Sequence, residues 1–442
     1  MGQTMTAPST PASTRRILTA SLVGTSVEYF DFYIYATAAA LVFGPLFFPN
    51  EDPGVELLLA YASLGTAFLA RPLGAWVFGH YGDRIGRKST LVASLLLMGG
   101  ATVAIAFLPT YASIGWWAPL ILNILRFCQG FGLGGEWGGA ALLAVENAPP
   151  GWQSRFGMMP QFGAPIGFIA ANGMFLILGL VLTPDQFMSW GWRLPFLFSI
   201  ILVGLGLWVR LKIAETPDFA KTLEEGPPPL VPIGELMRLH WRVTLGGTLA
   251  TVSCFAVYYI ATAFTLGYAT TSLAIDRQTF LSLQLAAILF MALGILISGY
   301  ASDRFGAYPV LIAGGIFAIA AALLLAPTLG SGSLPVIFAG LAVLLLAMGV
   351  IFGPIGAWLP SLFPTRVRYT GVSIAFNMAG IIGGGLTPVL AQALSQRGGL
   401  AMVGVYLTAA CVVSLAALLA LRPRVATPSA ILRPRANSDA PS

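Results

Sequence analysis

Three polar side chains that can bind a charged solute or a proton stand inside one long apolar segment, residues 119–145 of this 442-residue chain. The segment is long enough to cross a bilayer as a helix. Ionisable side chains at that depth are costly, so they usually face a water-filled cavity or pair with one another. At 100° per residue, Arg126, Gln129 and Glu136 fall within roughly 80° of one side of the helix. This face is typical of a helix that lines a transport path.

Three glycines form a second stripe on the same segment. Gly130, Gly134 and Gly138 recur at every fourth position, beside the polar face. Small residues at this spacing let a neighbouring helix backbone approach closely within a membrane. The segment therefore offers a polar face to a cavity and a smooth face to a partner helix.

Two acids and a tyrosine, Glu28, Asp31 and Tyr35, share one helix face in the first apolar segment. A carboxylate in a low-dielectric cavity binds a proton more readily than one in water, which a proton carrier needs. Alternatively, either acid is neutralised by a nearby arginine and only stabilises the fold. We expect Asp31 to carry proton coupling, and Glu28 stays open between the two roles.

Arg126 is expected to grip a substrate carboxylate with its planar guanidinium once an acidic partner is protonated. The alternative is a permanent ion pair. Arg71 either contacts substrate, snorkels, or pairs with Glu136 or Asp31, and Glu136 either binds a proton or orients Arg71. The residues assigned to substrate binding are Arg71, Arg126, Tyr35 and Gln129. Those assigned to proton coupling are Asp31, Glu28, Glu136 and Arg126.

The composition is that of a polytopic membrane protein. Hydrophobic residues make up 57% of the chain and charged residues 9%, and the mean hydropathy is +0.83. Soluble domains carry roughly 25% charged residues. Long apolar runs separated by short charged segments predict an all-α membrane protein. Twelve spanning segments are expected near residues 17–46, 55–79, 89–108, 117–146, 157–182, 190–211, 241–271, 279–301, 308–327, 334–361, 370–394 and 400–421.

One long polar loop divides these segments six plus six. The predicted parts are a disordered cytoplasmic tail at 1–16, a six-helix bundle at 17–212, a linker at 213–240, a second bundle at 241–421 and a disordered cytoplasmic tail at 422–442. Most of the 23 Lys and Arg residues fall on the cytoplasmic side if both termini are cytoplasmic. The net charge of +6 therefore reflects the orientation of the chain in a cell (inner) membrane, with its basic loops on the cytoplasmic side. It gives no support to nucleic-acid binding.

The two halves carry related loops after their second helices. Gly79–Lys88 and Gly299–Tyr308 each contain an Asp-Arg pair, and such repeats place a substrate site at mid-membrane where the halves meet. We interpret the cytoplasmic charges as breakable salt bridges that hold the outward-facing state, although a solvated girdle is the simpler alternative. This cytoplasmic gate comprises Asp83, Arg84, Arg87, Glu146, Arg155, Asp303, Arg304 and Arg366.

Three motifs carry a resemblance to a known family. Gly79–Lys88 reads G-x-x-x-D-R-x-G-R-K and resembles a signature of the major facilitator superfamily. Arg126–Gly130 and Glu28–Tyr35 resemble its metabolite–proton symporter branch, which includes carriers of shikimate, α-ketoglutarate, citrate and proline/betaine. The resemblance implies two pseudo-symmetric six-helix bundles and proton coupling. It also implies an acid on the first helix opposite an arginine on the fourth, which Asp31 and Arg126 match.

The second half departs from the family pattern. Ala307 and Tyr308 replace two basic residues, so the lock of that half should be weaker, and Asp83→Asn should impair transport more than Asp303→Asn. We expect Glu146 to lie near a basic residue of the first half, namely Arg84, Arg87 or Arg155. Gly163–Gly167 partly resembles a motif of drug–proton antiporters, but a proline kink explains it equally well.

The sequence contains no P-loop, no metal-ligand spacing and no nucleophile elbow, so we expect no ATP-driven transport, cofactor, metal or enzymatic activity. The leading hypothesis is a proton-coupled importer of a small organic acid or zwitterion, working by alternating access. The alternatives are a proton-coupled antiporter and a non-transporting membrane sensor. The expected partners are a small carboxylate, protons and the lipid bilayer, and the chain is expected to be monomeric.

Overall fold

The computed structural model describes residues 11–50, 52–85, 87–134, 136–212, 233–364 and 367–421, and some side chains, among them those of residues 79–91, lie outside this description. Residues 1–10 of the predicted tail at 1–16, the predicted tail at 422–442 and residues 213–232 of the predicted linker are also outside it. The described residues correct two of these boundaries: α1 begins at Pro11, within the tail predicted to be disordered, and α13 forms within the predicted linker.

The described residues of the first half form helices joined by short turns. Their bounds are α1 (Pro11–Ala38), η1 (Ala39–Phe43), α2 (Gly44–Phe47), α3 (Pro53–Ile85), α4 (Arg87–Ala106), α5 (Tyr111–Ile114), α6 (Trp117–Leu133), α7 (Glu136–Glu146), α8 (Gln153–Gly157), η2 (Pro160–Phe162), α9 (Gly163–Val181), α10 (Pro184–Ser189), η3 (Gly191–Arg193) and α11 (Leu194–Lys212).

The second half repeats this organisation. Its described helices are α13 (Ile233–Leu239), α14 (Trp241–Tyr259), η4 (Ile260–Phe264), α15 (Thr265–Thr271), α16 (Arg277–Phe305), α17 (Ala307–Leu323), α18 (Leu325–Leu329), α19 (Leu334–Ser361), α20 (Arg368–Gly380), η6 (Ile381–Gly385) and α21 (Leu386–Ala420).

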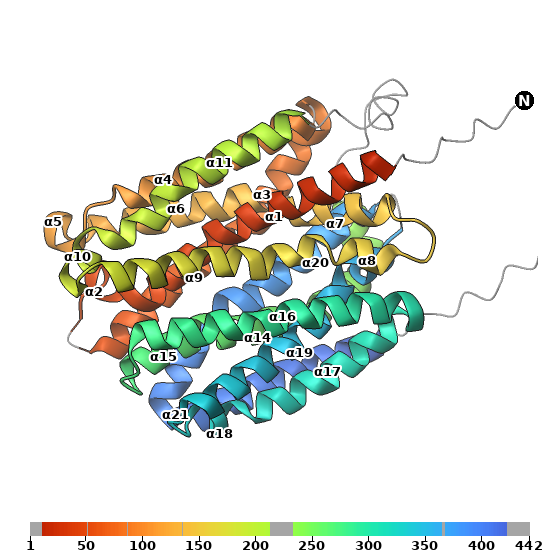
Figure 1. Ribbon diagram of the computed structural model, residues 1–442. Coiled ribbons are helices and arrows are strands. Elements are labelled where there is room, and N and C mark those ends of the chain that lie inside the picture. The colour runs from red at the N-terminus through yellow and green to blue at the C-terminus, as the bar shows by residue number, and fades with distance from the viewer. Residues whose placement is uncertain are drawn as a thin grey trace, which may run out of the picture.

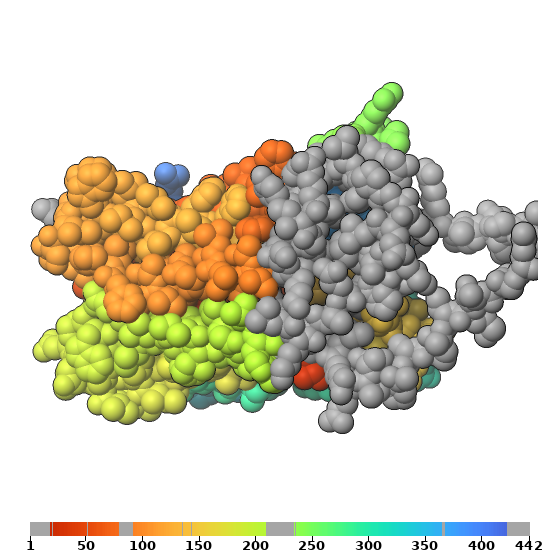
Figure 2. Space-filling model, turned by 90° about the horizontal axis from the view of Figure 1, so that it is seen from above, coloured from red at the N-terminus to blue at the C-terminus, as the bar shows by residue number. Residues whose placement is uncertain are grey.

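The helical segments of the described residues account for twelve crossings of a membrane. Eight are long and apolar enough by themselves, and one of these, Arg368–Ala420, turns back at Gly398 and Gly399 and so contains two crossings. The other three are α4, the broken pair α6–α7, and α17. Helices α4 and α11 pack together and lie side by side in Figure 2. Large apolar side chains of both helices, such as Leu97 and Ile201, are exposed, as expected of a surface that meets lipid.

The two halves form neighbouring helical bundles, coloured red to yellow-green and green to blue in Figure 1. They meet where α9 packs on α16 and where α3 packs on α20, η6 and α21. Three π-helical turns, η1, η4 and η6, interrupt long helices at this interface, and η1 contacts η4. π-Turns inside helices frequently mark functional sites because they redirect side chains and carbonyls.

Candidate substrate and proton site

Two buried guanidinium groups lie against the same phenylalanine ring. The Cζ atom of Arg126 on α6 is 4.1 Å from the centroid of the Phe32 ring, and that of Arg71 on α3 is 4.5 Å from it. Arg126 is 0% exposed and Arg71 is 7% exposed. A cation over an aromatic face is held most strongly when both are desolvated. Phe32 therefore keeps the two positive charges together at one place.

The glycine stripe sets how closely the two arginine-bearing helices approach. A Cβ atom at Gly130 would collide with the backbone of Ala67 on α3, and one at Gly134 would collide with the carbonyl of Arg71 itself. The predicted close approach is thus confirmed for these two glycines. Gly138 instead faces Ser373 on α20, in the other half.

Neither arginine forms a salt bridge with an acid among the residues that the structure describes, although the Glu28 carboxylate is close enough to Arg71 to favour its charge. The Nε and Nη2 atoms of Arg126 and the Nε atom of Arg71 are buried and donate no hydrogen bond. A buried donor left unpaired costs about 1–3 kcal/mol, and more when it is charged. Arg71 therefore neither snorkels nor pairs with Asp31 or Glu136. The arrangement suits an anion whose oxygen atoms accept these N–H groups.

A chain of hydrogen bonds joins Arg126 to Asp31. Arg126 Nη1 donates to Gln129 Oε1 (3.0 Å), and Gln129 Nε2 donates to Thr102 Oγ1 (2.7 Å). Thr102 Oγ1 lies 3.5 Å from Asp31 Oδ2 and also donates to the carbonyl of Met98 (2.9 Å). Arginine and acid are therefore linked through two side chains.

Asp31 and Arg126, which the family resemblance places opposite each other, are linked in this structure by the hydrogen-bond chain and form no direct ion pair. Asp31 is 2% exposed, and its other oxygen, Oδ1, accepts a 2.6 Å hydrogen bond from Ser199 on α11. Hydroxyl groups from α4 and α11 thus occupy the hydrogen-bonding positions around the carboxylate. Helical spacing on α1 and α6 alone does not predict these two hydroxyls.

The polar face expected to run from Arg126 to Glu136 is interrupted. Helix α6 ends at Leu133, and Glu136 begins a separate helix, α7. Glu136 is buried and accepts a 2.6 Å hydrogen bond from Ser94 on α4. It therefore belongs to a different contact from the one around Arg126. Glu28 is half-buried on α1.

Tyr35 positions Arg126. Its ring centroid lies 4.0 Å from Arg126 Cζ, and its hydroxyl donates to Ser63 Oγ on α3 (2.8 Å). The ring is fully buried, so its orientation is fixed by these contacts and by its contact with the Phe43 ring. Its direct contact with a substrate therefore stays a prediction, and in this structure the ring supports the guanidinium of Arg126.

Charged contacts join the two halves at one end of the molecule. Asp303 at the end of α16 accepts hydrogen bonds from the backbone N–H groups of Ser154 (2.8 Å) and Arg155 (3.3 Å) at the start of α8. The Arg155 Nε atom also pairs with Asp303 at 3.0 Å. A carboxylate at a helix N-terminus is stabilised by the free N–H groups there.

Glu146 pairs with Arg368 on α20, at 3.8 Å, and thus also bridges the halves. Arg368 was not among the partners expected for Glu146. Of those, Arg155 pairs with Asp303, and the side chains of Arg84 and Arg87 lie outside the described residues, as do those of Asp83 and Arg366. Arg304 is exposed, and its Cζ atom lies 5.2 Å from the ring centroid of the adjacent Phe305. The expected asymmetry between Asp83 and Asp303 therefore stays a prediction.

The halves touch on both sides of the arginine pair. Near the charged end, the Trp137 and Phe376 rings stack with centroids 3.5 Å apart, and Asn377 donates to the Gly134 carbonyl. Toward the other end, the Tyr61 hydroxyl donates to the Ala263 carbonyl (2.6 Å). The site is therefore closed off from both ends.

Two family models match the chain in succession. A sugar (and other) transporter model matches residues 17–226, and a Major Facilitator Superfamily model matches residues 246–441. The inner membrane metabolite transport protein YhjE of Escherichia coli is 47% identical over 416 residues, which cover 93% of this chain and 94% of that protein. The chain belongs to the major facilitator superfamily. Members of this family are transporters, so the chain is a membrane transport protein and not an enzyme.

Other relatives cover the chain to a similar extent. The Escherichia coli shikimate transporter is 36% identical, with 90% of this chain and 92% of that one covered. The proline/betaine transporter of Salmonella typhimurium is 33% identical, with 91% and 82% covered. The solved proton:xylose symporter XylE has a TM-score of 0.72 at 15% identity, covering 92% of this chain and 95% of that one. This last likeness confirms the twelve-helix fold.

Within this facilitator fold, three residues of the site were not singled out from the sequence. Phe32 adjoins Asp31 and is one of several aromatics in that stretch, and nothing distinguishes it until both arginines are placed. Thr102 and Ser199 stand in ordinary apolar helices. Their roles depend on which helices surround α1, and that arrangement is a property of the fold.

We expect Asp303→Asn to reduce active transport at least tenfold and Glu146→Gln to change it less than twofold. The Asp303 side chain is 4% exposed and binds two N–H groups and Arg155, and hydrogen bonds to a charged group contribute about 1.5–3 kcal/mol each. Glu146 is 57% exposed, and surface pairs contribute about 0–1 kcal/mol. Initial uptake rates in vesicles with matched protein amounts measure both. Equal losses would show that the two bridges hold the gate equally.

Proposed function

We propose that the protein imports a small organic anion together with protons by alternating access. It would do so from an inner membrane in which both termini are cytoplasmic. The observation that carries this proposal is the pair of buried arginines on Phe32, neither of which forms a salt bridge among the described residues. Two buried cations that share at most the more distant charge of Glu28 are costly, and an anionic cargo would lower that cost.

A carboxylate is the group that best fits Arg126. Its Nη1 atom is held by Gln129, which leaves Nε and Nη2 on one edge of the guanidinium without acceptors. These two N–H groups are spaced to meet the two oxygens of one carboxylate. Arg71 adds a second positive charge on the same ring, so the cargo is an acid and carries its negative charge when bound.

Asp31 is the proposed proton-binding group. No cation pairs with it among the described residues, and its hydrogen bonds come from Ser199 and Thr102. An isolated buried carboxylate is costly, and binding a proton removes its charge. The Thr102 hydroxyl has one hydrogen and two lone pairs. When Asp31 is protonated it donates to Thr102 Oγ1, whose own hydrogen goes to the Met98 carbonyl; when Asp31 is ionised, that hydrogen turns to Asp31.

Coupling then passes along the observed hydrogen bonds. Rotation of the Thr102 hydroxyl changes the acceptor that Gln129 meets, and Gln129 holds Arg126. The ionised Asp31 also competes electrostatically with a bound anion for the two arginines. Proton binding outside therefore favours cargo binding, and proton release inside favours cargo release, because each ligand changes the affinity of the other by the same factor.

Uptake of labelled carboxylates into proteoliposomes under an imposed pH gradient tests this function. We expect accumulation only when the interior is alkaline, with binding of acids and not of their amide analogues. Accumulation driven by an acidic interior would indicate the antiporter. A panel that is neither bound nor moved would leave the carboxylate assignment without support.

A further inference from the structure

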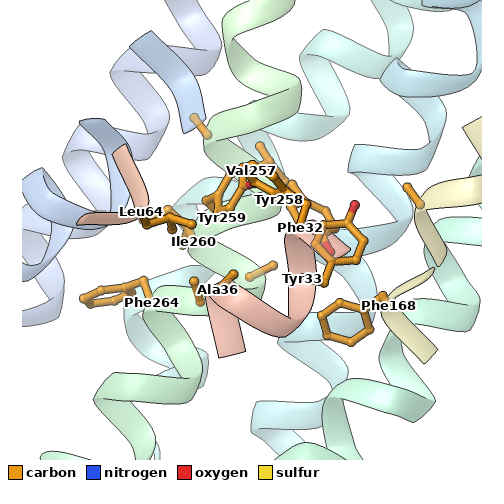
Figure 3. Close-up of a cluster of buried hydrophobic side chains, with 14 of the residues drawn as sticks. Phe32, Tyr33, Ala36, Leu64, Phe168, Val257, Tyr258, Tyr259, Ile260 and Phe264 are labelled. Atoms are coloured by element: carbon orange, nitrogen blue, oxygen red, sulfur yellow. The ribbon is translucent and has the colours of Figure 1, made fainter. Parts of the chain in front are cut away.

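A small cavity lies at the meeting of the two halves, beside the arginine pair. Its polar lining consists of Tyr33 and Thr37 on α1, Asn172 on α9, Tyr258 and Thr262 around η4, and Gln284 on α16. Figure 3 shows the Tyr33 and Tyr258 rings next to Phe32 and Phe168 in this region. Thr37 donates to Asn172 Oδ1 (2.6 Å), and Asn172 Nδ2 donates to the Phe168 carbonyl, so the hydrogen-bonding groups of these two side chains are paired.

Two other lining groups, the Tyr258 hydroxyl and the Gln284 Oε1 atom, are buried without a hydrogen-bond partner. Gln284 is 1% exposed, and its amide nitrogen donates to the carbonyls of Ala261 (3.1 Å) and Thr262 (2.8 Å). These are carbonyls of the π-helical turn η4, where the regular helical pairing is disturbed. Because both are acceptors, they fix the amide nitrogen on their side. The Oε1 atom is left with no hydrogen-bond donor, although it is buried in the lining of the cavity.

We propose that this cavity binds a hydroxyl group of the cargo, with Gln284 Oε1 as the acceptor. The inference rests on the proposed function, because it places the carboxylate of the same cargo on Arg126 and Arg71. Packed aromatic rings connect the cavity to the arginines: the Phe32 ring, on which both guanidinium groups lie, contacts Tyr259 (6.3 Å between centroids), and Tyr259 contacts Tyr258, which lines the cavity. The preferred cargo is therefore a hydroxylated carboxylic acid.

A hydroxyl suits the cavity better than an ammonium group. No acidic side chain contributes to the lining, so a cation there would have no counter-charge. The two guanidinium groups nearby would also repel it. A hydroxyl can donate to Gln284 Oε1 and brings no charge with it. An unhydroxylated acid would leave that oxygen unpaired, which costs free energy.

Binding of matched acids to the purified full-length protein tests this assignment. The pairs are malate against succinate and quinate against cyclohexanecarboxylate, with Kd measured by calorimetry. We expect the hydroxylated acid of at least one pair to bind about tenfold more tightly, which is about 1.4 kcal/mol. Gln284→Leu should abolish this ratio and leave the affinity for the unhydroxylated acid within twofold.

A matched control is Gln392→Leu. Gln392 on α21 is also buried and its Oε1 atom also lacks a donor, but it does not line the cavity. That variant should keep the tenfold ratio. Retained binding of the unhydroxylated acid shows that Gln284→Leu is folded; if it is lost, Gln284→Asn, which keeps the amide and shortens the side chain, should reduce the ratio instead.

The outcomes separate this inference from the proposed function. If the wild-type protein binds both acids of each pair equally, or if Gln284→Leu and Gln284→Asn keep the ratio, the cavity assignment is overturned while carboxylate transport stands. Tighter binding of glycine betaine than of any hydroxy acid would also overturn it, in favour of an ammonium site. If no acid binds, the proposed function fails, and the cavity assignment fails with it.

Discussion

Arg126→Lys is expected to weaken carboxylate binding by about ten- to hundredfold while leaving the fold intact. Hydrogen bonds to a charged group contribute about 1.5–3 kcal/mol, and a lysine ammonium cannot present two parallel N–H groups to a carboxylate. The substitution also removes the planar group that lies between the Phe32 and Tyr35 rings. Charge alone is kept, so the loss reports the geometry of the guanidinium.

Equilibrium binding of a labelled carboxylate to purified protein measures this effect. Arg193→Lys is the matched control, because Arg193 also binds protein carbonyls, those of Ser189 and Leu108, but lies on the partly exposed turn η3 away from Phe32. We expect that variant to bind normally. If Arg126→Lys binds the carboxylate as tightly as the wild-type protein, the cargo is held elsewhere and Arg126 is a structural residue.

The features of the fold that depend on local sequence were predictable. The length of each apolar run predicts a membrane-spanning helix. The glycines at every fourth position predicted the close contact that Gly130 and Gly134 make with α3. The end of α6 at Leu133 was not predicted, because a glycine such as Gly134 serves close helix packing as well as helix ends. Glu136 is also ten residues beyond Arg126, about 15 Å along a helix, so a shared helix face does not bring the two side chains together.

The candidate site was predicted in part. Burial of Arg71, Arg126 and Asp31 follows from their places in apolar runs, and all three are buried. Their partners do not follow, because a contact such as that between Asp31 and Ser199 joins residues far apart in the chain. Gln284 shows the same limit. Its proposed role depends on the η4 carbonyls that fix its amide nitrogen, and no residue pattern predicts a π-helical turn.

Asp31→Asn is expected to abolish accumulation driven by a pH gradient while exchange of substrate continues within about twofold of the wild-type rate. The asparagine amide reproduces the hydrogen bonds of the protonated acid, since its oxygen can accept from Ser199 and its nitrogen can donate to Thr102 Oγ1. The site is therefore held in the cargo-binding form and cannot release a proton. Counterflow and gradient-driven uptake, measured in the same proteoliposomes, separate the two activities.

The hydrogen-bond chain predicts that Thr102→Val shows a milder form of the same defect. Valine has the shape of threonine but cannot pass a change at Asp31 on to Gln129, so exchange should persist while accumulation falls several-fold. Thr66→Val is the matched control, because the Thr66 hydroxyl is likewise hydrogen-bonded to an amide side chain, donating to that of the half-buried Asn123, but has no hydrogen bond to Asp31. If Asp31→Asn still concentrates substrate at the normal rate, Asp31 is not the coupling acid, and Glu28 and Glu136 become the acids to test. If Asp31→Asn fails but Thr102→Val accumulates normally, the proton acts on the arginines through its charge alone and the hydroxyl relay plays no part in coupling.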